Sequence, residues 1–356
     1  MSRVRLRDLG ITIGRLPTGP HNAITDVPGV LVGHSTIIHD GPRVARTGVT
    51  VILPRDGDIW RDFVFAGHYA FNGCGEMTGL LWLEESGTLG TAIALTSTYS
   101  VGAAHDALVA YAAENGHPNL LPVVAETHDG WLNDGGGFHV RREHVFAAIA
   151  SARGGPVAEG NVGGGTGMIC HEFKGGIGTA SRRAETPGGV YTVGVLVQSN
   201  YGERFSLRVD GVPVGREIGP ERVPTPWEAM PDGTSIIAVI ANDAPLLAAQ
   251  CKRLARRATV GLARAGGLGQ TFSGDIFLAF ATGNHLPRYA DAPFDVKMLP
   301  THQIDPLLEA AAEATEEAIL NALTAAETMT GQRDRVVHAL PLDELQRVMA
   351  RYRSAG

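Results

Sequence analysis

The sequence predicts a layered α/β fold for this chain of 356 residues. Two observations predict it. Short apolar runs rich in β-branched residues recur along the chain, and longer segments with helix-capping residues lie between them. Most of the runs are almost continuously apolar rather than alternating, which is typical of strands that are covered on both faces. Strands and helices mixed in this way pack as α/β layers.

The apolar runs give the expected strands. They lie at 48–54, 62–67, 90–96, 120–126, 190–198, 235–241 and 275–281. The segment 205–218 is different, because its apolar and polar residues alternate around Asp210-Gly211. This pattern predicts a hairpin near the surface.

Four helices are expected from caps and apolar spacing. They run over 101–116, from Asp243 and Pro245 to about 265, from Asp305-Pro306 to about 330, and over about 342–352. Gly116 is a C-terminal cap for the first, because glycine adopts the left-handed conformation at little cost. Pro245 and Pro306 suit the first turn of a helix, where no backbone N–H is needed.

Composition and charge narrow the classes of function. The net charge is −7 and no block of Lys or Arg stands out, which argues against a nucleic-acid partner. Cys74, Cys170 and Cys251 are far apart and odd in number, so they fit a reducing compartment rather than a disulfide framework. No apolar signal segment opens the chain and no apolar run is long enough for a membrane span. We therefore expect a cytoplasmic protein.

One linker raises a specific chemical possibility. Residues 219–234 hold four prolines and two glycines in sixteen positions, which predicts an exposed loop. The loop leads directly into the apolar run that opens with Ser235. If the chain were cut before this serine, its new α-amino group, with a pKa of about 7.7–8.0, could serve as the base for its own hydroxyl.

Other kinds of site have weaker support. The glycine-rich run 160–167 lacks the GK[ST] signature of a phosphate-binding loop, although its backbone N–H groups could still hold an anion. The thirteen histidines include no HExxH pair, and the chain contains no Cys-x-x-Cys, so we expect no metal. A Gly-x-Ser-x-Gly elbow is also absent, which argues against an α/β-hydrolase.

Several long segments, in order, resemble one enzyme family. They are RLRDLGITIGRLPTGPHNAITDVPGVLVGHST at 5–36, NGCGEMTGL at 72–80, AETHDGWLND at 125–134, GNVGGGTGM at 160–168, VLVQSNYG at 195–202, SIIAVIANDAPL at 235–246 and SGDIFLAF at 273–280. Over nearly its whole length the chain resembles the self-processing L-aminopeptidase D-Ala-esterase/amidases and β-peptidyl aminopeptidases. These are serine aminopeptidases of the N-terminal-nucleophile type.

The resemblance implies an architecture and an assembly. It implies a four-layer α-β-β-α sandwich formed by a single domain, 1–356. It also implies self-cleavage between Thr234 and Ser235 into an α-chain, 1–234, and a β-chain, 235–356, which remain together. Neither a metal nor an organic cofactor is implied, and the expected assembly is a homotetramer.

The resemblance also implies roles for single residues. Ser235 matches the nucleophile, and Asn200 matches a side chain that donates to the oxyanion. Ser273 and Asp275 match a hydroxyl–carboxylate pair that supports Ser235. Glu126 matches the acidic group that binds the free ammonium of the substrate.

Three positions depart from the family pattern. Thr234 precedes the nucleophile where glycine or asparagine is more familiar, and its branched side chain could slow the self-cut. No tyrosine stands near 125–130 as a second oxyanion donor, and the nearest candidates are His128 and Trp131. If the His128 ring donates, its protonation would make the activity depend on pH. Cys74 replaces a usual asparagine and receives no catalytic role.

The expected reaction is hydrolysis of N-terminal aminoacyl amides, esters or small peptides through an acyl-enzyme on Ser235. Two alternatives remain open at this stage. An acyl transferase on a related fold would use the same nucleophile with an amine as acceptor. An unprocessed binding protein would instead hold an anion or nucleotide at 160–167.

Overall fold

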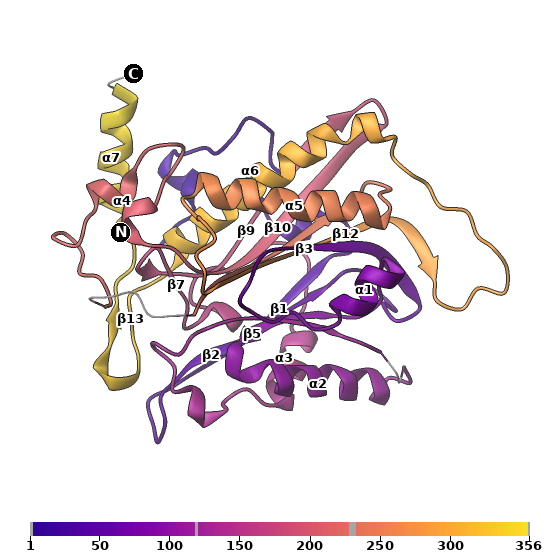
Figure 1. The fold of residues 1–356 in the computed structure, drawn as a ribbon, viewed down its shortest axis with the longest axis horizontal. Coiled ribbons are helices and arrows are strands. Elements are labelled where there is room, and N and C mark those ends of the chain that lie inside the picture. The colour runs from indigo at the N-terminus through magenta and orange to yellow at the C-terminus, as the bar shows by residue number, and fades with distance from the viewer. Residues whose placement is uncertain (1–2, 118–119, 228–232, 355–356) are drawn as a thin grey trace.

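Two β-sheets face each other at the centre of the molecule, and helices cover both outer faces (Figure 1). The computed structural model describes residues 3–117, 120–227 and 233–354. The resulting layers are helix, sheet, sheet and helix. This arrangement confirms the expected four-layer α-β-β-α sandwich.

The larger sheet has six strands in the order β4-β3-β12-β11-β10-β9. Their bounds are β3 Asp62–Gly73, β4 Thr88–Leu89, β9 Gly176–Thr186, β10 Gly189–Asn200, β11 Thr234–Asn242 and β12 Ser273–Pro287. The central strands β11 and β12 run parallel, and every other neighbouring pair is antiparallel. As a result β11 and β12 both begin at the edge of the sheet where β3 and β10 end.

The smaller sheet has four strands in the order β1-β2-β5-β6. Their bounds are β1 Leu31–His39, β2 Ala45–Leu53, β5 Ile93–Ser97 and β6 Val123–Thr127. β5 and β6 are parallel, and the remaining pairs are antiparallel.

Successive side chains of the central strands face opposite sides of the sheet, and both sides are covered, which explains why the sequences of these strands are continuously apolar. On β11, Ile237 and Val239 face the smaller sheet and pack with Ile93 and Leu95. The intervening residues, such as Ile240, face the opposite way and pack with the helices α5 Ala248–Arg264 and α6 Asp305–Ala325. Both faces of β11 are therefore buried, as the sequence predicts.

The helices α2 Val101–Glu114 and α3 Arg142–Ala150 form the outer layer on the smaller sheet. Shorter elements complete the chain. They are α1 Leu80–Ser86, α4 Val214–Glu217 and α7 Leu342–Ser354, the two-stranded pairs β7 Ile169–Cys170 with β8 Phe173–Lys174 and β13 Met329–Thr330 with β14 Val336–Val337, and 3-10 turns at Leu6–Leu9, Ile24–Asp26, Thr98–Ser100, Gly135–Gly137, Gly163–Gly165, Arg204–Ser206, Thr301–Gln303 and Gln332–Asp334. None of the helices in the described ranges is long and apolar enough to cross a bilayer.

The hairpin predicted over 205–218 is wrong beyond its turn. Asp210 and Gly211 do adopt the left-handed conformation, but only one bridge, between Val209 and Val212, flanks them. The chain then turns into α4. Leu207, Val209 and Val214 are all fully buried, so the segment packs on the core from both sides instead of pairing as a surface ladder.

Candidate active site

Three neighbouring strands of the larger sheet bring the expected catalytic residues together. In the register, Ser235 at the start of β11 lies opposite Asn200 at the end of β10. On its other side Ser235 lies opposite Gly274, between Ser273 and Asp275 of β12. Segments separated by more than thirty residues in the sequence thus meet at one edge of the sheet.

Ser235 is almost completely buried, with 3% of its surface exposed. Its Oγ donates a hydrogen bond to the carbonyl oxygen of Thr234, at 2.6 Å. The backbone N–H of Gly274 donates to the same Oγ over 3.4 Å. The hydroxyl therefore lies beside the carbonyl group of the Thr234-Ser235 bond.

The orientation of the Asn200 amide is fixed by the first residue of β7. Its Oδ1 accepts a hydrogen bond from the N–H of Ile169 at 2.8 Å, and only the amide oxygen can accept. Its Nδ2 consequently points the other way, donating to the carbonyl of His128 at 3.0 Å and to that of Gly233 at 3.5 Å. The Asn200 donor thus faces the chain two residues before Ser235.

Ser273 and Asp275 form the expected hydroxyl–carboxylate pair. Ser273 Oγ donates to Asp275 Oδ1 at 2.7 Å, and both side chains are buried. Burial raises the pKa of Asp275 to about 6, although hydrogen bonds from Ser273 and from the backbone N–H of Ile236 work against the rise. Ser273 is also the register partner of Thr234, so the pair lies next to the expected scissile bond.

Asn72, at the end of β3, holds the start of β12 in place. Its Nδ2 donates to the carbonyls of Gln270, at 2.6 Å, and of Ser273. Sequence reasoning missed this role, although Asn72 opens the segment NGCGEMTGL that carries part of the family resemblance. Its neighbour Cys74 has an exposed, free thiol.

Glu126, near the end of β6, lies one backbone segment away from the start of β12, the strand beside the nucleophile strand. A side chain at Gly75 would place its Cβ 3.2 Å from Glu126 Oε1 and 3.1 Å from the Cα of Gly274, so the chain at Gly75 separates the two. Glu126 accepts hydrogen bonds from the N–H of Glu76, at 3.0 Å, and from Thr98 Oγ1. Burial raises the pKa of its carboxyl group despite these bonds.

His128 is also close to the nucleophile strand, and no carboxylate of the described residues is hydrogen-bonded to its ring. Its Cδ2 is 3.4 Å from where a Cβ on Gly233 would lie, and its ring centroid is 5.6 Å from that of Tyr99. Burial lowers the pKa of His128 and thereby favours the neutral form of its ring. The group of His128 that Asn200 contacts is the backbone carbonyl, not the ring.

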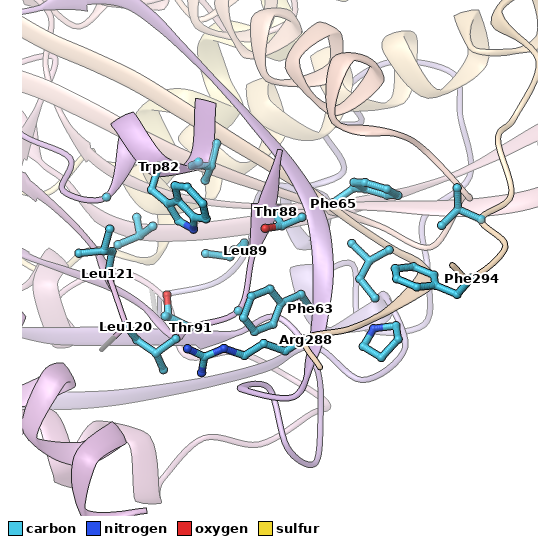
Figure 2. A pocket seen from close by; sticks show the side chains of 17 residues that line it. Phe63, Phe65, Trp82, Thr88, Leu89, Thr91, Leu120, Leu121, Arg288 and Phe294 are labelled. Atoms are coloured by element: carbon cyan, nitrogen blue, oxygen red, sulfur yellow. The ribbon is translucent and has the colours of Figure 1, made fainter. Parts of the chain in front are cut away.

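A cavity of about 220 Å³ opens beside these residues. Asn200, Gly233, Thr234, His128 and Trp131 are among the residues that line it, whereas Ser235 and Glu126 are not. A larger apolar cavity of about 760 Å³, shown in Figure 2, lies at the opposite ends of β3, β6 and β12. It is lined by Phe63, Trp82, Leu121 and Phe294 among others, and by none of the expected site residues.

The glycine-rich run 160–167 packs inside the protein rather than forming an open cradle. Gly163, Gly164 and Gly165 are all buried. The N–H groups of Gly163 and Gly164 donate to the hydroxyls of Thr36 and Thr50. These donors are already used within the protein, which argues against an anion site there. Within the described ranges, no three His, Cys, Asp or Glu side chains are grouped to hold a metal ion.

The sequence matches a known family over most of its length. The model of peptidase family S58 matches residues 22–337. The β-peptidyl aminopeptidase BapA of Sphingosinicella microcystinivorans is 47% identical, over 98% of this chain and 92% of that protein.

Solved structures agree with these matches. A β-aminopeptidase of Burkholderia sp. is 53% identical, with a TM-score of 0.92 over 98% of this chain and 99% of that one. The L-aminopeptidase D-Ala-esterase/amidase of Ochrobactrum anthropi is 45% identical, with a TM-score of 0.89 over 98% of each chain. That enzyme is described as a prototype serine aminopeptidase and a variant of the N-terminal-nucleophile hydrolase fold.

Proposed function

Since the chain belongs to peptidase family S58 and is an aminopeptidase and amidase with the N-terminal-nucleophile fold, we propose that Ser235 is its nucleophile and that it cuts its own Thr234-Ser235 bond. The strand register carries this assignment. Ser235 is the one serine of β11 and lies between a fixed amide donor, Asn200, and the buried Ser273–Asp275 pair. The products would be the chains 1–234 and 235–356 of one domain.

Maturation begins with attack of Ser235 Oγ on the carbonyl carbon of Thr234. The 2.6 Å hydrogen bond from this Oγ to the Thr234 carbonyl oxygen holds the two groups together. The hydroxyl proton passes to the Ser273–Asp275 pair, which returns it to the departing nitrogen as the C–N bond breaks. Water then hydrolyses the new ester, leaving a carboxylate on Thr234 and a free α-amino group on Ser235.

The free Ser235 amine then acts as the base in catalysis. It accepts the proton of its own hydroxyl, whose oxygen attacks the substrate carbonyl. The Nδ2 of Asn200 donates to the oxyanion, and the leaving amine takes the proton. Hydrolysis of the acyl-enzyme regenerates the serine.

Glu126 and His128 complete the proposed binding site. The Glu126 carboxylate receives the free ammonium of the substrate, which selects amides, esters and peptides with an unblocked N-terminus. His128 lies beside Gly233 and would border the acyl group. Because two relatives at 47% and 53% identity are named as β-aminopeptidases, we include N-terminal β-aminoacyl residues among the substrates. Comparing β-alanyl and L-alanyl p-nitroanilides tests this, and activity on the L-compound alone would reject it.

The nucleophile is tested by Ser235→Ala and Ser235→Cys. The alanine variant should fold, stay uncut and release no amine from aminoacyl amides, because it lacks the attacking atom. The cysteine variant keeps a nucleophile and should retain self-cleavage. Amine release by folded Ser235→Ala at the wild-type rate would overturn the assignment.

The expected homotetramer and cytoplasmic location remain proposals. Exposed apolar side chains that line the larger cavity, including Trp82, Leu121 and Phe294, support an assembled form, because such patches favour contacts between proteins. The three free cysteines support a reducing compartment. Light scattering on the purified protein tests the assembly, and a monomer at micromolar concentration would reject it.

A further inference from the structure

A cation that the proposed mechanism does not use lies in the wall of the active-site cavity. Arg335 follows the Gln332–Asp334 turn and precedes β14, far in sequence from every expected site residue. The same cavity of about 220 Å³ is lined by Asn200, Thr234, Trp131, Trp227 and Arg335, among others.

The guanidinium of Arg335 is held against Trp131. Its Cζ lies 3.8 Å from the centroid of the Trp131 ring, which is within the range of a cation–π contact. One of its nitrogens, Nη1, donates to the Trp131 carbonyl at 3.2 Å. Arginine has five N–H donors, so this contact fixes the plane of the group and leaves further donors for a ligand.

This cation has no acidic partner among the described residues. Burial lowers the pKa of Arg335, and the nearby Arg333 lowers it further. A partly desolvated guanidinium in a cavity is suited to an anion that it can bind through two parallel hydrogen bonds. A carboxylate has that geometry.

The cavity brings this cation to the proposed oxyanion donor. Arg335 and Asn200 line the same cavity, whereas Glu126 is not among its lining residues. The Asn200 amide donates to the carbonyl of His128, three residues before the Trp131 on which Arg335 stacks. A peptide whose scissile carbonyl lies at Asn200 can therefore extend its leaving group, with the C-terminal carboxylate, into the cavity that Arg335 lines.

We infer that Arg335 binds the C-terminal carboxylate of a short peptide substrate, and that the enzyme prefers free dipeptides over the corresponding dipeptide amides. This inference rests on the proposed function, because it takes Ser235 as the nucleophile and Glu126 as the ammonium site. Arg335 is then a specificity residue that acts on the leaving group, and Trp131 positions it.

The test compares L-alanyl-L-alanine with L-alanyl-L-alanine amide, and β-alanyl-L-alanine with its amide. For whichever pair is cleaved, wild-type kcat/KM should be at least about tenfold higher for the free dipeptide than for its amide. The amide lacks the carboxylate and so loses the charge-assisted contact. Arg335→Met should lower kcat/KM for the dipeptide by about the same factor and leave the amide within about twofold. Arg335→Lys should give an intermediate kcat/KM for the dipeptide, because lysine keeps the positive charge but cannot form two parallel hydrogen bonds to a carboxylate.

Arg333→Met is the matched control, since Arg333 is an exposed cation two residues away, and it should keep the wild-type ratio. Equal wild-type values for dipeptide and amide, or an equal loss of both in Arg335→Met, would overturn the inference. The wild-type comparison needs no variant, so a poorly folding Arg335→Met does not remove the test. Hydrolysis of neither member of any pair would instead count against the proposed function.

Discussion

At Asp275, burial and hydrogen bonding act in opposite directions on one carboxyl group. Burial dominates and raises its pKa to about 6, while Ser273 and the Ile236 N–H favour the charged form. The group is therefore largely ionised at pH 7 and can accept a proton, and it becomes protonated within an accessible pH range. A carboxyl with its ordinary pKa would be a weaker base.

Self-cleavage should consequently depend on pH through Asp275. We expect the rate to fall as the pH drops below about 6, because protonated Asp275 cannot accept the proton of the attacking hydroxyl. Asp275→Asn should slow the cut by about 100-fold, within the usual range for general-base removal, and abolish this pH dependence. Gel densitometry over time at pH 5 to 8 measures both effects.

Asp243→Asn is the control for that experiment. Asp243 also has a pKa raised by burial, but it follows the far end of β11 from Ser235. It should leave the rate of the cut unchanged. A wild-type rate that is flat from pH 5 to 8, or an unaffected Asp275→Asn, would contradict the role of Asp275.

Among single residues, the family resemblance predicted the site residues that lie on the segments matching the family. Ser235, Asn200, Ser273 and Asp275 do meet at the ends of neighbouring strands. Arg335 could not be predicted, because its segment carries no chemical motif and reaches the cavity only through the β13–β14 turn. When folding brings a residue to a site from a distant segment, the sequence around that residue carries no motif that reveals its role.

Among the elements, the segment from Gly163 to β7 fixes the orientation of the Asn200 side chain. Lys174 is completely buried, and its Nζ donates to the carbonyls of Met168, at 2.8 Å, and Gly175, at 2.9 Å, with a longer bond to Gly165. Burial lowers its pKa to about 7. The loop that Lys174 holds also presents the Ile169 N–H that orients Asn200.

Replacing Lys174 should therefore act through Asn200. We expect Lys174→Met to slow self-cleavage about tenfold, because a loosened Ile169 no longer fixes the amide donor, and Asn200→Ala to slow it about 100-fold. The double variant should be no slower than Asn200→Ala alone. Rates from time courses, with circular dichroism to check folding, measure this coupling, and fully multiplicative losses would show that the two residues act independently.

Elements with a regular apolar pattern were predictable, and those stabilised by buried polar groups were not. The run that forms β11 is apolar on both faces and was predicted within one residue at each end. β9 was missed because buried Ser181 and Arg182 interrupt its apolar pattern. These side chains are tolerated only because partners from distant segments satisfy them.

In the molecule as a whole, a buried ion network joins the N-terminal segment, β9 and α6. Arg182 pairs with Glu313 at 3.0 Å and with Glu317 at 2.6 Å, and all three are buried. Arg7 adds a second cation to Glu317 at 2.8 Å. Burial alone would raise the pKa of Glu317, but its contacts with Arg7 and Arg182 hold it below the ordinary value.

Removing Arg182 should destabilise the whole fold. Arg182→Met leaves two buried carboxylates without their shared cation, which should cost about 3–5 kcal/mol in the free energy of unfolding. Arg183→Met, at the exposed neighbouring position, should cost about 0.5 kcal/mol or less. Urea unfolding of uncleaved Ser235→Ala carrying each change measures both, and equal effects would contradict a structural role for the network.

In the mechanism proposed above, this chain activates itself by cutting before Ser235. The most direct measurement is the intact mass of the purified, denatured protein after prolonged incubation, with Ser235→Ala treated in parallel. We expect two species from the wild type, one ending at Thr234 and one beginning at Ser235, and a single uncut chain from the variant. A wild-type chain that stays whole, or a cut at another bond, would contradict self-activation at Ser235.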